Sequence, residues 1–253
     1  MTVASFPHLS KSPIQEALID LQVRLPDTTD REAFVTLRDK LEENYPRVDE
    51  KHTHTFQMEV KKAETQRQLR TSATDLGFAG FWMTSSDEKN VLQVRLDGFT
   101  LSRLAPYTSW DDMRDRARDG WSRYVDMLKP ELVTRVATRY INHIKVALPI
   151  RNIGEHLLFP PQAPSEMPGQ GKGFLSRVTT EDPDRGIMVH LIQALAPGDD
   201  PHHAAIILDI DALKSVEYGA KDGVVWEALE ELRIVKDQVF FSALPEAMIE
   251  SFR

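Results

Sequence analysis

Residues 135–148 constrain the fold most, because apolar and basic side chains alternate along them. Side chains on a β-strand point alternately to its two faces, so this pattern predicts a strand with one apolar and one cationic face. The apolar positions are Val136, Tyr140, Ile144, Val146 and Leu148. The basic positions are Arg135, Arg139, His143 and Lys145. Such a strand belongs in a sheet that is covered on one side and polar on the other.

Further strands and helices are predicted before and after this strand. Alternating polarity predicts strands over residues 14–25, 55–61, 78–84, 91–101, 174–180, 187–195 and 204–213. Apolar spacings of three and four predict helices over residues 31–44, 110–128 and 222–241, with short helices over 153–158 and 246–252. In the helix over 222–241, one core position falls on either Val235 or Lys236. These elements predict an α+β fold, with antiparallel or mixed sheets and helices packed on one face.

A segment rich in proline and glycine divides the chain. It holds Pro160, Pro161, Pro164 and Pro168, followed by Gly169, Gly171 and Gly173. We therefore predict an N-terminal α+β half over residues 1–149, a connection over 150–173 and a C-terminal α+β half over 174–253. Both halves hold an apolar strand with aspartates, then a loop and a helix that opens near a tryptophan. One interpretation of this shared order is that the two halves have similar folds.

Composition excludes several classes of protein. The net charge of -8 argues against a duplex-DNA binder, because binding to phosphates requires a basic surface. The absence of cysteine excludes disulfides and thiolate chemistry. The first residues do not form a basic and then apolar leader, and no apolar run approaches the length of a membrane span. We therefore expect a soluble cytoplasmic protein without membrane contact.

Four short motifs carry a family resemblance. They are Pro13-Ile14-Gln15-Glu16, Tyr45-Pro46, Arg139-Tyr140-Ile141-Asn142 and Leu208-Asp209-Ile210-Asp211. In their order and spacing the chain resembles a sporadically distributed, biochemically uncharacterised prokaryotic family of about this length, with a P-I-x-E opening and a central R-Y-x-N strand. The resemblance implies no substrate, cofactor or catalytic residue. Its scattered distribution implies a bacterial defence or mobile-element setting.

The candidate ligand-binding residues are polar and lie on strands that we expect to be neighbours. They are Arg135, Arg139, His143, Asp97 and Glu16. One interpretation is a salt-bridged sheet face, either in water or buried under the C-terminal half, with an Arg139–Glu16 pair. The other is a groove for an anionic ligand, because guanidinium groups bind phosphate and carboxylate in a forked geometry.

The remaining polar motifs indicate structural roles. We expect Asp209 and Asp211 to accept hydrogen bonds from helix or loop amides, since no phosphate-binding loop accompanies them. Asn142 falls on the apolar side of its strand, and we expect it to bond the backbone of an adjacent loop. No catalytic residue, metal site or cofactor is predicted. The histidines lack a third ligand at metal-binding spacing.

These features lead to two hypotheses about function. The features do not decide whether the protein is an enzyme. The first is a non-catalytic binding or regulatory protein that acts through a protein partner or as a homo-oligomer. The alternative is a sensor of an anionic small molecule or nucleotide, or an enzyme of phosphate esters, that uses the cationic sheet face.

Overall fold

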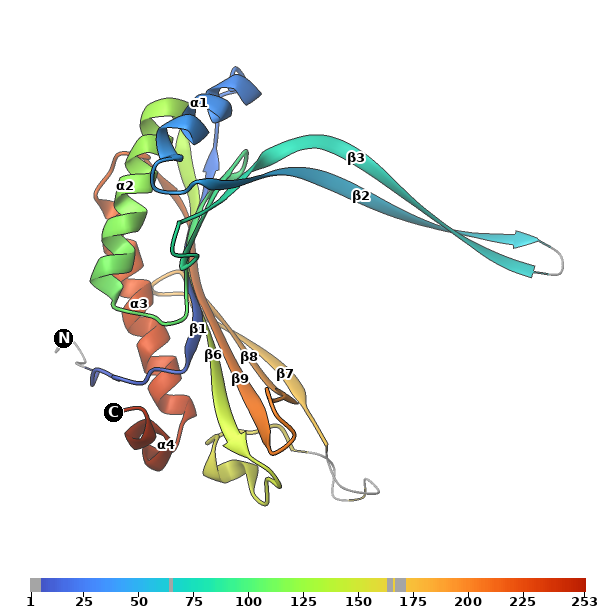
Figure 1. The fold of residues 1–253 in the computed structure, drawn as a ribbon, viewed down its shortest axis with the longest axis vertical. Coiled ribbons are helices and arrows are strands. Elements are labelled where there is room, and N and C mark those ends of the chain that lie inside the picture. The colour runs from blue at the N-terminus through green and yellow to red at the C-terminus, as the bar shows by residue number, and fades with distance from the viewer. Residues whose placement is uncertain (1–5, 64–65, 163–165, 167–171) are drawn as a thin grey trace.

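A single antiparallel sheet of nine strands forms the body of the protein, in the order β2-β3-β4-β5-β1-β6-β9-β8-β7. The computed structural model describes residues 6–63, 66–162, 166 and 172–253, and residues 54–76 by their backbone alone. The helices lie along one face of the sheet (Figure 1). The predicted α+β fold, with helices on one face of an antiparallel sheet, is thereby confirmed. The similarity of the two halves stays a prediction.

The strands and helices follow one another along the chain in this order. The strands are β1 (Ile14–Arg24), β2 (Arg47–Ala63), β3 (Gln66–Thr84), β4 (Asn90–Arg95), β5 (Gly98–Leu104), β6 (Leu132–Ala147), β7 (Leu175–Asp182), β8 (Ile187–Pro197) and β9 (His203–Tyr218). The helices are α1 (Arg31–Leu41), α2 (Trp110–Leu128), α3 (Val224–Ala243) and α4 (Glu246–Ser251), with a short 3-10 turn at Ile153–Glu155.

Helix starts follow the capping residues in the sequence. The carboxylate of Asp30 accepts a hydrogen bond from the backbone N–H of Ala33 at 3.0 Å, at the start of α1. The hydroxyl of Ser109 accepts one from the backbone N–H of Asp112 at 3.2 Å, at the start of α2. These bonds satisfy N–H groups that have no partner within the helix, which is why both starts could be predicted.

The predicted strand over residues 91–101 is wrong in one respect, because it is a hairpin of β4 and β5. Arg95 pairs with Gly98, so Leu96 and Asp97 form a two-residue turn between them. Leu96 is 42% exposed rather than part of the core. A Cβ atom on Gly98 would lie 2.3 Å from the carbonyl oxygen of Leu21, so the close approach of β1 requires glycine here. The two-residue connection at Leu96-Asp97 therefore interrupts the alternation that predicted one strand.

Strands β2 and β3 form a hairpin much longer than the predicted strands over 55–61 and 78–84. They pair continuously from Arg47 with Thr84 to Ala63 with Gln66, with two register shifts. The far part of this hairpin projects from the body, away from the helices (Figure 1). We call residues 54–75 of this hairpin the arm.

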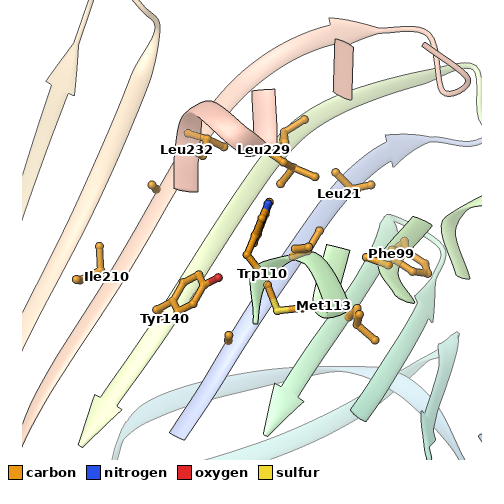
Figure 2. Close-up of a cluster of buried hydrophobic side chains, with 14 of the residues drawn as sticks. Leu21, Phe99, Trp110, Met113, Tyr140, Ile210, Leu229 and Leu232 are labelled. Atoms are coloured by element: carbon orange, nitrogen blue, oxygen red, sulfur yellow. The ribbon is translucent and has the colours of Figure 1, made fainter. Parts of the chain in front are cut away.

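The core lies between the sheet and the helices. Register places Ala17 opposite Tyr140 and Leu21 opposite Val136, and Tyr140 lies opposite Ile210 on β9, so these side chains share one face. Helix α3 packs on β6 and β9, and α2 packs on β5. Figure 2 shows Tyr140 and Ile210 from the sheet in one cluster with Trp110, Leu229 and Leu232 from the helices. The apolar face predicted for residues 135–148 is therefore the covered face, except at Leu148, which lies beyond the end of β6 and is 45% exposed.

The two ends of the described chain meet beside α4. The backbone N–H of Lys11 donates to the carbonyl of Phe252 at 2.9 Å, and the hydroxyl of Ser10 donates to the carbonyl of Arg253 at 2.7 Å. Within the described residues, no helix combines the length and apolar character needed to cross a membrane.

Buried tyrosines predict a loss of stability at alkaline pH. Burial raises the pKa of Tyr107 from 10.0 to about 12, a shift that the hydrogen bond with Tyr140 opposes. The phenol of Tyr107 then loses its proton near pH 10 in the unfolded chain, but only near pH 12 in the native protein. The free energy of unfolding should fall by about 2–3 kcal/mol across this interval through Tyr107 alone. Urea unfolding at a series of pH values measures the fall.

The matched variant for this prediction is Tyr107→Phe. Its free energy of unfolding should fall less than that of the wild type between pH 10 and 12, because Phe has no proton to lose. An equal fall in both proteins would show that Tyr107 does not cause it.

Candidate functional site

The face of the sheet opposite the helices carries alternating ionic and aliphatic side chains. We call this surface the open face. Across one row of paired residues it presents Leu18, Arg139, Asp211 and His190. Across the next row it presents Glu16, Ile141, Asp209 and Ile192. Antiparallel pairing produces this pattern, because residues opposite one another point to the same side.

Arginines on β6 and β4 share one aspartate on β1. Nη1 of Arg135 donates to Oδ2 of Asp20 at 2.7 Å, and Nη2 of Arg95 donates to Oδ1 of Asp20 at 3.0 Å. Nε of Arg95 also donates to Oδ1 of Asp97 at 2.9 Å. Side chains of Asp20, Arg95 and Arg135 are about four-fifths buried, with 19%, 20% and 23% of their surface exposed. The network therefore joins β4, β1 and β6 through side chains that are partly shielded from water.

Arg139 binds an aspartate on β9 in a forked geometry. Its Nε donates to Oδ1 of Asp209 at 2.8 Å, and its Nη2 donates to Oδ2 at 2.6 Å. The expected Arg139–Glu16 pair is not the main contact, because Leu18 faces Arg139 across β1 and Glu16 faces Ile141. This bidentate bond raises the pKa of Arg139, so the guanidinium stays charged.

Burial and neighbouring charges also shift the pKa values of Asp211 and Arg95. Burial raises the pKa of Asp211, against the opposing effect of Arg135 and Arg139. Nη2 of Arg135 donates to Oδ2 of Asp211 across a long 3.4 Å. For Arg95, the carboxylates of Asp20 and Asp97 raise the pKa although burial alone would lower it. Asp211 thus accepts a weaker charge-assisted hydrogen bond than Asp209 does.

The structure brings four of the five predicted site residues onto the open face. Arg135, Arg139, Glu16 and the exposed His143 lie there on β6 and β1, and Asp97 lies in the turn beyond, where it contacts Arg95. Residues 174–253 do not cover this face, because β7, β8 and β9 extend the same sheet sideways. The ligand-binding role of the five residues stays a prediction.

Sequence reasoning missed the role of Asp209 and Asp211. They accept hydrogen bonds from arginine side chains on β6, not from helix or loop amides. A signal for this was present, since both strands carry charges at alternate positions, with opposite sign. The register places Asp211 directly opposite Arg139, but the guanidinium reaches diagonally to Asp209, so only the side-chain contact in the tertiary structure assigns the partner.

Asn142 lies on the covered face and bonds a strand, whereas a loop was expected. Its Nδ2 donates to the carbonyl of Leu208 on β9 at 2.8 Å, and only 1% of the residue is exposed. Since β6 and β9 are neighbours, a side chain on β6 can reach this carbonyl directly. The amide therefore helps to fix the register of the central strands.

No protein-family model matches the chain, and no curated protein sequence matches it. Among the side chains that the structure describes, no group of three or more His, Asp or Glu residues is arranged to hold a metal ion. Interpretation of the open face therefore depends on its geometry.

The two aspartates of β9 should differ in their contribution to stability. Asp209→Asn should lower the free energy of unfolding by about 1–2 kcal/mol, because Arg139 loses a bidentate partner. This value lies between those typical of exposed and of buried ion pairs, since the side chain of Arg139 is 43% exposed. Asp211→Asn should cost less than about 1 kcal/mol, because Arg135 keeps its shorter bond to Asp20. Urea unfolding at pH 7 measures both. Equal losses would contradict this ranking.

Proposed function

We propose that this protein is a non-catalytic binding protein that recognises a protein partner through the open face. The observation that carries the proposal is the mixture of neutralised ion pairs and half-buried aliphatic side chains on that face. The aliphatic members are Leu18, Ile141, Ile192, Ile207 and Leu213. Protein interfaces combine such apolar patches with arginine and with satisfied polar groups.

The ion pairs favour a protein over a small anion or a nucleic acid. The guanidinium charges of Arg135 and Arg139 are already compensated, because Arg135 donates to Asp20 and Arg139 donates to Asp209. A phosphate bound beside either arginine would also lie near its aspartate, and the two negative charges would repel each other. A protein surface can cover these pairs without breaking them.

The arm supports the same proposal. It extends away from the helices, on the side of the sheet that they leave uncovered (Figure 1). A partner seated on the open face would therefore also come within reach of the arm, and the contact area would grow. A cytoplasmic location and a bacterial defence setting belong to this proposal as well, supported by composition and by the family resemblance respectively.

Site-specific photo-crosslinking in the source cell tests the proposed surface. A photoreactive phenylalanine analogue at Ile192 should give one discrete adduct, because this position lies within the open face. The same analogue at Glu227, which is exposed on α3, is the matched control and should not give that adduct. Mass spectrometry of the adduct identifies the partner, and an adduct of two copies of this chain would identify a homo-oligomer.

A second variant tests whether the adduct at Ile192 requires specific binding of the partner to the open face. Ile141→Asp places an unpaired carboxylate in the middle of the open face and should abolish the adduct at Ile192 while the protein stays folded. An adduct that persists in Ile141→Asp, or that forms equally from Glu227, would overturn the proposal.

A further inference from the structure

A cavity lies on the covered side of the sheet, at the opposite face from the proposed partner surface. Its volume is about 420 Å³, and it is bounded by residues 6–14, by the loop before α2, by β6 and by the C-terminal part of α3. Six of its nineteen lining residues carry a phenyl, phenol or indole ring. The rings belong to Phe6, Tyr107, Trp110, Tyr140, Phe240 and Phe241. This size and this lining are typical of sites for small organic ligands.

The wall also contains a buried amine. Only 8% of Lys236 is exposed, and its Nζ lies 3.7 Å from the centroid of the Tyr140 ring. The same Nζ is 2.5 Å from Oδ1 of Asp237. A lysine amine carries three N–H donors, so a carboxylate and a ring face leave one donor for a ligand. Burial lowers the pKa of Lys236, and Asp237 opposes that effect.

Two tyrosine hydroxyls add a second donor. The hydroxyl oxygens of Tyr107 and Tyr140 lie 3.2 Å apart, so one of them donates to the other. One O–H group of the pair then remains available to a ligand in the cavity. Both phenols are neutral at pH 7, since burial raises the pKa of each.

The charges that line the cavity favour an anion. Arg233 and Lys236 place two cationic donors in the wall, and the carboxylates that contact them belong to Asp237 and Glu230. The hydrogen bonds of Arg233 are long, with its Nε 3.3 Å from Glu230 and its Nη1 3.4 Å from Asp237, and its guanidinium lies 5.9 Å from the centroid of the Trp110 ring. Its guanidinium can therefore turn toward a ligand at little cost.

We propose that this cavity binds a small planar aromatic carboxylate. The aromatic walls would hold the ring system by stacking and by edge contacts. Lys236, Arg233 and one tyrosine hydroxyl would donate to the carboxylate. The site is independent of the open face, because the sheet separates them.

Calorimetric titration of the full chain at pH 7 tests the class of ligand. The probes are 2-naphthoate, the neutral 2-naphthamide and the cationic 2-naphthylmethylamine, which share one ring system. We expect 2-naphthoate to bind at least about tenfold more tightly than the amide, as a charge-assisted contact requires. Equal affinity for acid and amide, preference for the amine, or no binding of 2-naphthoate at millimolar concentration would overturn the proposal.

Variants then assign the donors. Lys236→Met keeps the apolar stem and removes the amine, and should weaken 2-naphthoate binding about tenfold without changing the affinity for the amide. The matched control is Lys214→Met, because Lys214 is also largely buried and paired, with Glu231 at 2.5 Å, but lies outside the cavity. The control should bind as the wild type does. Equal affinities of the two variants for 2-naphthoate would exclude Lys236 as a donor.

Arg233→Gln keeps the test decisive if Lys236→Met does not fold. It removes the guanidinium charge and leaves the aromatic side chains of the cavity in place. We expect a loss of about threefold or more for 2-naphthoate and none for 2-naphthylmethylamine. An unchanged affinity for 2-naphthoate in Arg233→Gln would then overturn the proposal.

Discussion

Strand β6 pairs with β1 on one side and with β9 on the other, and the rest of the structure depends on this double pairing. It joins the strands before residue 150 and those after residue 173 into one sheet. It also sets which residues share a face, because a shift by one position would move every side chain to the other side. The covered core and the ionic open face are therefore two consequences of one register.

The two faces of β6 perform different tasks with neighbouring residues. Arg139 points to the open face and binds Asp209, whereas Tyr140 points to the core and borders the cavity. Asn142 lies on the same side as Tyr140 and bonds the backbone of β9. The four-residue motif Arg139-Tyr140-Ile141-Asn142 thus contributes to both proposed surfaces, because alternate side chains of a strand point in opposite directions.

Local chemistry made several elements predictable. Asp30 and Ser109 mark helix starts because their side chains satisfy N–H groups of the first turn. Alternation identified β1 and β6 because each has one covered and one polar face. The hairpin turn at Leu96-Asp97 was missed because apolar alternation continues on both sides of it. The length of the arm was underestimated because its strands extend beyond the regular pattern. For the helix over 222–241, the sequence left one core position open between Val235 and Lys236. Helical spacing alone cannot distinguish a buried lysine from one whose amine reaches water.

By itself, the sequence determined the class of fold, the starts of α1 and α2 and the face of β6 that is buried. Periodicity and capping decide these features, and both act between residues close in the chain. Only the tertiary structure decided that Arg139 binds Asp209 rather than Glu16, that residues 174–253 extend the sheet instead of covering it, and that Tyr107, Tyr140 and Lys236 meet at one cavity. These contacts join residues far apart in sequence, so they depend on strand order and register, which no local pattern specifies.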